Sequence, residues 1–345
     1  MKSEKAFPST LEIFQSFSQR KFEKMAISIF QYQAQHNRIY NKYISSLGVI
    51  PEQVVSMFQI PFLPIELFKT QKVLTVQSEK LSGARKKITP TLFLSSGTTG
   101  MVRSKHFVFD TNLYEQSFSK AFELFYGDIK KYYLLSFLPS YYSNKNSSLL
   151  YMANKLMKRS EKKECRFYKK NEADRLIKTI QQLLKKNKKV ILLGVSNALL
   201  DLELNNSLKI ARKSKNLVVM ETGGMKGRKE EVTRAELHKI LCNKFGVKKI
   251  HSEYGMTELL SQAYSKGDGI YQCPPWMRVL IRDANDPFSY LADGRTGAIN
   301  IIDFANLHSC SFLATQDVGK LQSKNTFEVL GRLDNSDLRG CSLLS

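Results

Sequence analysis

Five short segments of this 345-residue chain combine glycines with hydroxyl, charged or aromatic groups that could bind a ligand. The first, Ser95-Ser-Gly-Thr-Thr-Gly100, follows an apolar run that is typical of a strand. Its glycines allow a tight turn and a close approach of the backbone to a ligand, while its hydroxyls and exposed backbone amides can surround phosphate oxygens. It lacks the Gly-Lys pair of a P-loop, and a Ser/Thr/Gly loop taken alone is more often an ordinary loop. Its interpretation therefore depends on the other four segments.

Those four segments add aromatic, acidic and basic groups in a fixed order along the chain. Glu221-Thr-Gly-Gly-Met-Lys-Gly-Arg228 combines three glycines with two cations, and Glu253-Tyr-Gly-Met-Thr-Glu258 offers an aromatic face, a hydroxyl and a carboxylate. Ala314-Thr-Gln-Asp-Val-Gly319 places the carboxylate of Asp317 in an expected turn, and Gly331-Arg-Leu-Asp334 pairs a cation with an anion. Each segment is weak evidence alone, so the order and spacing of the set carry the information.

The elements that must position these segments change character along the chain. Residues spaced by three and four between Leu11 and Ile29 predict helices near the N-terminus. From about residue 90, apolar runs at 91–94, 132–137, 189–193 and 217–220 alternate with amphipathic segments near 111–125, 172–186, 196–213 and 230–245. This alternation predicts parallel strands joined by helical crossovers. After about residue 265, short strands with Gly, Asp and Asn turns predict a smaller β-rich lobe, so we expect two domains, residues 1–265 and 266–345.

Composition and charge restrict the class of protein. The chain has 42% hydrophobic residues and a net charge of +22, from 53 Lys and Arg against 31 Asp and Glu. The composition is that of a globular protein, and no apolar run approaches the ~18 residues of a membrane-spanning helix. The N-terminus shows no secretory signal, so we expect a cytoplasmic protein.

The lysines are spread along the chain and partly interleaved with glutamate, which favours solvated faces over a nucleic-acid site. Five cysteines without a Cys-x-x-Cys pair argue against disulfides and structural zinc.

Taken in order, the segments resemble the core motifs of the adenylate-forming superfamily of acyl and aryl ligases. Residues 95–100 resemble its phosphate loop, 254–258 its Tyr-Gly-x-Thr-Glu segment, 315–319 its ribose-binding turn and 331–334 its Gly-Arg-x-Asp hinge. The chain ends soon after this hinge, where such ligases continue into a mobile C-terminal domain. That ending, the 221–228 segment and Cys341 near the terminus are similar to the acyl-protein synthetases of bacterial bioluminescence fatty acid reductase complexes, the LuxE family. The resemblance implies an α/β fold with helix-flanked, mostly parallel sheets and a smaller β-rich lobe, lacking the mobile C-terminal domain.

The resemblance also implies roles for individual residues, with ATP and Mg²⁺ as cofactors and a carboxylic acid, expected to be a fatty acid, as substrate. Thr257 would contact the α-phosphate and Glu258 would hold Mg²⁺. Cys341, as a thiolate, would take the acyl group as a thioester and pass it to an acceptor protein such as an acyl reductase. The implied nucleotide ligands are Ser95, Ser96, Gly97, Thr98, Thr99 and Gly100 at the phosphates, Gly223, Gly224, Tyr254 and Gly255 at the adenine, and Asp317 and Arg332 at the ribose.

Two departures from the superfamily pattern and two other functions stay open. The phosphate loop continues Gly100-Met-Val-Arg-Ser-Lys105 without the usual proline, and the catalytic lysine of the mobile domain has no counterpart. Lys226, Arg228 or Lys105 could neutralise the substrate carboxylate instead. The chain could also be an acid-thiol ligase that forms acyl-coenzyme A or an acyl-carrier thioester, or a non-catalytic basic protein that binds nucleic acid or an acidic partner. Cys341 could be a terminal cysteine without a role, and His251 and His308 are expected to be structural.

Overall fold

Two units make up the fold, as seen in the computed structural model, which describes residues 10–75, 89–96, 102–139, 144–203, 214–223, 233–323 and 325–333. The first unit groups Met1–Ser117, Thr257–Ser261 and Cys273–Ser345, and the second groups Phe118–Met256 and Gln262–Gln272. This grouping differs from a boundary at residue 265, because the N-terminal helices pack with the C-terminal strands.

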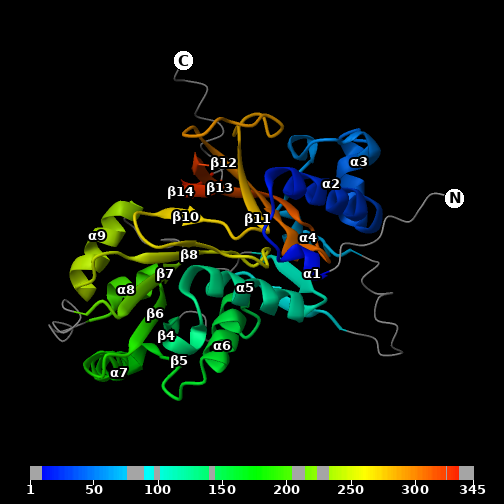
Figure 1. Cartoon of the computed structure of the whole chain (residues 1–345). Coiled ribbons are helices and arrows are strands. Elements are labelled where there is room, and N and C mark those ends of the chain that lie inside the picture. The colour runs from blue at the N-terminus through cyan, green and yellow to red at the C-terminus, as the bar shows by residue number, and fades with distance from the viewer. Residues whose placement is uncertain are drawn as a thin grey trace. The chain divides into compact units, whose positions relative to one another are not determined.

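The second unit is built on the predicted parallel strands. The strands are β4 (Tyr132–Phe137), β5 (Arg166–Phe167), β6 (Lys189–Val195), β7 (Leu217–Thr222) and β8 (His251–Tyr254), in the order β8-β7-β6-β4-β5 (Figure 1). All neighbours in this series pair in parallel. Antiparallel β9 (Ala263–Ser265) and β10 (Ile270–Gln272) extend the sheet beyond β8. The prediction of parallel strands is confirmed for the runs at 132–137, 189–193 and 217–220, whose Leu, Ile and Val residues are typical of strands covered on both faces. It is wrong for the run at 91–94, which pairs antiparallel with Lys105–Val108 in a separate hairpin.

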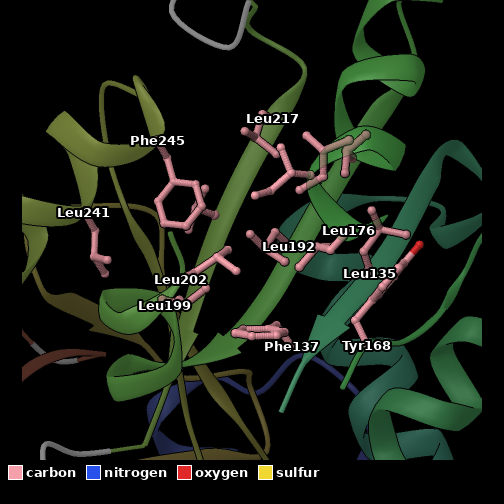
Figure 2. Packing of buried hydrophobic residues seen from close by; sticks show 14 of the residues in the cluster. Leu135, Phe137, Tyr168, Leu176, Leu192, Leu199, Leu202, Leu217, Leu241 and Phe245 are labelled. Carbon is pink, nitrogen blue, oxygen red and sulfur yellow. The ribbon is translucent and has the colours of Figure 1, made fainter. Parts of the chain in front are cut away.

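Helices join these strands and bury one apolar face each. They are α6 (Ser148–Ser160), α7 (Ala173–Lys185), α8 (Ser196–Asp201) and α9 (Arg234–Phe245), while α5 (Thr111–Tyr126) begins in the first unit and ends in the second. α9 starts with a capping box formed by Thr233 and Glu236 and ends at Gly246, whose φ of 67° suits glycine. Figure 2 shows Leu199 and Phe245 in the buried cluster around Leu192 of β6. This packing fixes the carboxyl ends of β7 and β8, where two of the predicted nucleotide segments begin.

The first unit contains antiparallel strands, as expected for the β-rich lobe. β11 (Met277–Arg282), β12 (Thr296–Asp303), β13 (Phe312–Ser323) and β14 (Thr326–Arg332) pair in sequence, and β1 (Leu63–Pro64) joins β13 in parallel. A separate hairpin consists of β2 (Thr91–Leu94) and β3 (Lys105–Val108). The N-terminal helices are α1 (Thr10–Ile13), α2 (Gln19–His36), α3 (Arg38–Ser46) and α4 (Leu67–Thr70). None of the helices in the described ranges has the length and apolar character needed to span a bilayer.

Helix α2 packs on the segment that joins β12 to β13. The Phe22 ring stacks on the Phe304 ring with their centroids 4.4 Å apart. The fully buried Gln33 amide donates to the carbonyls of Asn306 and Leu307 at 3.0 and 2.9 Å, and its oxygen accepts from the Ser311 amide at 2.9 Å. A helix near the N-terminus therefore fixes the backbone of residues 306–311.

Candidate active site

The base of the predicted phosphate loop is closed by two serines. The Ser95 amide donates to the Ser104 carbonyl at 3.1 Å, and the Ser104 amide donates to the Ser95 hydroxyl at 2.9 Å. Ser95 is half-buried and Ser96 is exposed. The hydrogen bonds between Ser95 and Ser104 therefore join the two ends of the β2–β3 hairpin, and Ser96 is the next residue of the chain after this junction.

Glu258 lies at the same point. Its side chain accepts a hydrogen bond from the Ser104 hydroxyl, and the residue is only 5% exposed. Burial raises the pKa of Glu258, and the negative charge of Asp317 raises it further. The hydrogen bond from Ser104 and the positive charge of Arg332 lower this pKa but do not cancel the rise. The charges of Asp317 and Arg332 therefore both act on the Glu258 carboxylate. The structure thus brings the predicted phosphate-loop base, metal ligand and ribose ligands together.

Asp317 and Arg332 are opposite residues of β13 and β14. Arg332 Nε donates to Asp317 Oδ1 at 3.0 Å. The expectation of a turn at Asp317 is wrong, because the residue lies inside β13. A register shift follows at Val318 and Gly319, and such bulges redirect neighbouring side chains within a strand. The carboxylate and guanidinium are therefore held side by side on a strand pair, and their binding of a ribose stays a prediction.

The backbone of residues 257–261 is held by three side chains from two other segments. His106 Nδ1 lies 2.7 Å from the Thr257 carbonyl, and Asn306 Nδ2 donates to the Glu258 carbonyl at 2.8 Å. The amides of Leu260 and Ser261 donate to Asp303 Oδ2 at 2.9 and 3.0 Å. This segment carries Thr257 and Glu258, so its tethers fix where those two side chains start.

Sequence reasoning missed four of the residues that build this site, Ser104, His106, Asp303 and Asn306. The structure shows a pattern that the sequence alone does not: Ser104 and His106 are buried while Lys105 between them is exposed. That alternation is the period of a strand with one buried face. Lys105 is exposed, and its role as a cation for the substrate carboxylate stays a prediction.

The second unit carries the residues predicted to hold adenine. Gly223 follows β7 with a φ of 78°, a conformation that glycine adopts without strain. Tyr254 ends β8, and its ring lies edge-on to the Tyr271 ring at 5.7 Å. At Gly255 a Cβ atom would lie 2.6 Å from Glu253 Oε1, so a larger residue would displace that carboxyl group. Adenine binding by Gly223, Tyr254 and Gly255 stays a prediction.

Two buried glutamates on adjacent strands have opposite electrostatic surroundings. Glu221 of β7 accepts hydrogen bonds from Ser196 Oγ at 2.7 Å and from Arg234 Nη1 at 2.5 Å. Burial opposes its ionisation, but the hydrogen bond from His238 and the charge of Arg234 lower the pKa of Glu221 overall. Glu253 of β8 accepts from Thr222 Oγ1 at 2.5 Å, and burial raises its pKa to about 7. One carboxyl group is thus ionised at neutral pH, while the other titrates there.

A comparison with known families decides which protein family these features represent. The sequence profile of the family described as acyl-protein synthetase, LuxE, matches residues 9–345. The chain belongs to the LuxE acyl-protein synthetase family. The family membership expected from the motifs is confirmed. No curated protein sequence matches this LuxE-family chain at a significant level.

Solved structures show the same fold at low sequence identity. ATP-bound MatB from Rhodopseudomonas palustris matches with a TM-score of 0.52 and 18% identity, over 70% of this chain and 47% of MatB. A 2-hydroxyisobutyryl-CoA ligase in complex with 2-HIB-AMP and CoA matches with a TM-score of 0.61 and 12% identity, over 96% of this chain and 73% of the ligase. The LuxE-family chain therefore spans about half of MatB and has the fold of adenylate-forming enzymes, as predicted.

Several predicted site residues of this LuxE-family chain lie outside the described residues, and their roles stay predictions. They are Gly97, Thr98, Thr99 and Gly100 of the phosphate loop, Gly224, Lys226 and Arg228 of the 221–228 segment, and Cys341. Lys226, Arg228 or Lys105 is still the cation expected to neutralise the substrate carboxylate.

The donor set at Glu258 fits magnesium. Mg²⁺ commonly binds one or two carboxylates and completes its coordination with substrate phosphates and water. Glu258 supplies one carboxylate beside the base of the predicted phosphate loop, and its hydrogen bond to Ser104 orients it. Glu258 would therefore hold the ion together with nucleotide phosphate oxygens.

Replacing Asp303 with alanine is expected to lower the free energy of unfolding by about 3 to 5 kcal/mol. The fully buried Asp303 carboxylate accepts hydrogen bonds from the amides of Leu260, Ser261 and Ala305 and from the Ser261 hydroxyl. Alanine would leave these donors buried without an acceptor. Urea denaturation measures the loss, and Asp286→Ala is the control, because Asp286 is exposed and accepts comparable local bonds. A loss for Asp303→Ala as small as that of the control would contradict the expectation.

The stability of the protein is expected to fall as the pH rises through the titration of Glu253. Burial raises the folded-state pKa of Glu253 from 4.5 to about 7, so between these values the folded state binds more protons than the unfolded state. The free energy of unfolding therefore decreases by about 3 kcal/mol from pH 4.5 to pH 7. Glu253→Gln should remove this decrease in urea titrations at pH 5, 6, 7 and 8. Parallel pH dependences for the variant and the parent would show that Glu253 is not the source.

Proposed function

We propose that this LuxE-family chain is an ATP-dependent acyl-protein synthetase. It activates a carboxylic acid, for which we propose a long-chain fatty acid, as an acyl-adenylate. It then captures the acyl group on Cys341 and transfers it to an acceptor protein such as an acyl reductase. The observation that supports the proposal is the buried Glu258 carboxylate, which accepts a hydrogen bond from Ser104 and is affected by the charges of the paired Asp317 and Arg332. The cytoplasmic location stays a prediction.

The first half-reaction joins two anions. A carboxylate oxygen of the acid attacks the α-phosphorus of ATP, and the bond from this phosphorus to pyrophosphate breaks. Ser95, Ser96 and the loop amides would hold the departing pyrophosphate, while the Thr257 hydroxyl would donate to the α-phosphate. Glu258 would hold Mg²⁺, which reduces the repulsion between the reactants when it is bound. Asp317 would accept hydrogen bonds from ribose hydroxyls, and Arg332 would donate to the ribose from the adjacent strand.

The second half-reaction is a nucleophilic substitution at the acyl carbon. The Cys341 thiolate attacks the adenylate carbonyl, the bond to the phosphate oxygen breaks, and AMP leaves. A cysteine with an ordinary pKa of about 8.5 is mostly protonated at neutral pH, so the thiolate needs support. Arg339, two residues before Cys341 in the sequence, would favour the thiolate, while Asp334 and Asp337 oppose it.

The acid-thiol ligase is the second candidate. It is favoured by the similarity to a coenzyme A ligase over 96% of this chain, at 12% identity. In that reaction a free thiol, rather than Cys341, would attack the adenylate. The two functions share the adenylation half-reaction and differ only in the acceptor.

Intact mass spectrometry tests the proposal. The protein is incubated with ATP, Mg²⁺ and a panel of fatty and aromatic acids, without any added thiol. The expected result is a mass increase by one acyl group that hydroxylamine removes and that peptide analysis places on residue 341. Acyl transfer that occurs only with added coenzyme A would support the acid-thiol ligase. A chain that shows neither an adduct nor acid-dependent pyrophosphate exchange would refute both functions and favour a non-catalytic basic protein.

A further inference from the structure

His106 is a buried histidine directly behind the Thr257–Glu258 pair. It lies on β3, is fully buried, and its ring meets the Phe68 ring edge-on at 5.5 Å. Its Nδ1 atom faces the Thr257 carbonyl at 2.7 Å, and within the described part of the chain its Nε2 atom has no hydrogen-bond partner. Because a carbonyl can only accept, the proton must lie on Nδ1. Burial lowers the pKa of His106 to about 4, so the ring is a neutral donor at physiological pH.

The next carbonyl along the chain is held from a different segment. Asn306 Nδ2 donates to the Glu258 carbonyl at 2.8 Å, and the Asn306 carbonyl in turn accepts from Gln33 of α2 at 3.0 Å. Glu258 therefore stands between two peptide planes, each of which is tied to a separate part of the first unit. With both planes fixed, the backbone dihedral angles of Glu258 are fixed, and so is the direction of its Cα–Cβ bond.

Residues 257–261 depend on such tethers because they belong to no helix or strand. In a regular element, the backbone hydrogen bonds of the ladder or helix would set the position of each side chain. Here that task falls to His106, Asn306 and Asp303. Catalytic groups must be held near their productive geometry, and a displacement of about 1 Å can cost roughly 100-fold in rate.

We propose that His106 is a positioning residue for adenylation. Its Nδ1–H group holds the Thr257 carbonyl and so sets the Thr257 hydroxyl and the Glu258 carboxylate against the α-phosphate and its Mg²⁺. This inference rests on the function proposed above, but it concerns a residue outside the motifs that suggested that function. The bond joins residues 151 positions apart in the chain.

The test compares two substitutions that differ in hydrogen-bonding ability. His106→Leu keeps a side chain of similar bulk without a donor, while His106→Asn retains an amide donor near the position of Nδ1. Tyr40→Phe is the matched control, because the buried Tyr40 hydroxyl donates to the Pro61 carbonyl at 2.6 Å, away from residues 257–261. Acid-dependent ATP–pyrophosphate exchange gives kcat, the KM for the acid and the Mg²⁺ concentration at half-saturation, and thermal denaturation gives Tm.

For His106→Leu we expect kcat to fall by roughly 10- to 100-fold and the half-saturating Mg²⁺ concentration to rise. The KM for the acid should stay within about twofold of the wild-type value. His106→Asn should recover most of the lost rate, even if its Tm is as low as that of His106→Leu. Tyr40→Phe should lose stability without losing rate. Should His106→Leu not fold, Asn306→Ala provides the same test on the Glu258 carbonyl.

Two outcomes would overturn the role proposed for His106 while leaving the proposed function intact. In one, the wild-type protein is active and His106→Leu loses no more rate than Tyr40→Phe. In the other, His106→Asn is as slow as His106→Leu at the same stability, which would show that a hydrogen-bond donor at this position does not support the rate. A wild-type protein without exchange for any acid would instead overturn the proposed function, and the role of His106 in adenylation with it.

Discussion

Replacing Glu258 with glutamine is expected to slow acid-dependent ATP–pyrophosphate exchange by roughly 100- to 1,000-fold, which corresponds to about 3 to 4 kcal/mol of transition-state stabilisation. Glutamine keeps the size of the side chain and can keep the hydrogen bond with Ser104, but it removes the negative charge that would hold Mg²⁺. The loss should appear mainly in kcat, and higher Mg²⁺ concentrations should restore part of it. Exchange kinetics at several Mg²⁺ concentrations measure both effects.

The pH profile of exchange provides an independent measure of the same carboxylate. Burial raises the pKa of Glu258, and the ionised form is the one that can bind a cation. Activity should therefore fall with decreasing pH at a higher pH than an ordinary glutamate would cause, and Glu258→Gln should lack this acid limb. Glu236→Gln is the control, since Glu236 is exposed and caps α9. Equal exchange rates and equal profiles for Glu258→Gln and the control would refute the assignment.

Local sequence patterns predicted the individual strands well. The runs at 91–94 and 132–137 are strands with those same bounds, because an apolar run between turn or helix signals has few other solutions. The alternation of strands and amphipathic segments also predicted that β4, β6 and β7 run parallel, whereas β8 and the order of the strands came from the structure. Each of these inferences needs only neighbouring residues and the handedness of crossovers.

Long-range packing could not be predicted in the same way. The grouping of the N-terminal helices with the C-terminal strands depends on contacts such as the one from Gln33 to Asn306, which joins residues 273 positions apart. A buried glutamine in an amphipathic helix gives no sign of its partner. The expected turn at Asp317 was wrong for a related reason, because a bulge within paired strands cannot be distinguished from a turn without knowledge of the pairing.

The residues of the candidate site also fall into two groups, those that sequence motifs identified and those that only the structure identified. Glu258, Asp317 and Arg332 were found because they occur in motifs whose order resembles a known superfamily. Ser104, His106, Asp303 and Asn306 were not found, because a serine, a histidine, an aspartate and an asparagine are ordinary in their own surroundings. They become part of a site only when the fold brings them to Glu258 and its neighbours. Motifs therefore identified the groups expected to touch the substrate, and the structure identified the groups that hold them.

Cys341→Ser is expected to abolish the covalent acyl-enzyme while leaving pyrophosphate exchange within about twofold of the wild-type rate. Exchange reports the first half-reaction, which needs ATP, the acid and the Glu258 site but no thiol. Serine is nearly the same size as cysteine, yet its hydroxyl is far less acidic and stays protonated at neutral pH, so it cannot replace the thiolate. Intact mass spectrometry should show no hydroxylamine-labile adduct, and acyl-AMP should accumulate on the protein.

The combination of the two measurements separates the candidate functions. Cys242→Ser is the control, because Cys242 is a half-buried cysteine of α9 and should leave both exchange and adduct intact. A Cys341→Ser protein that still becomes acylated would move the nucleophile to another residue. A wild-type protein that exchanges pyrophosphate but acylates only added coenzyme A would identify an acid-thiol ligase. Loss of the adduct with retained exchange is the one result that requires Cys341 to act after the adenylate has formed, which is the order in which a thioester relay must work.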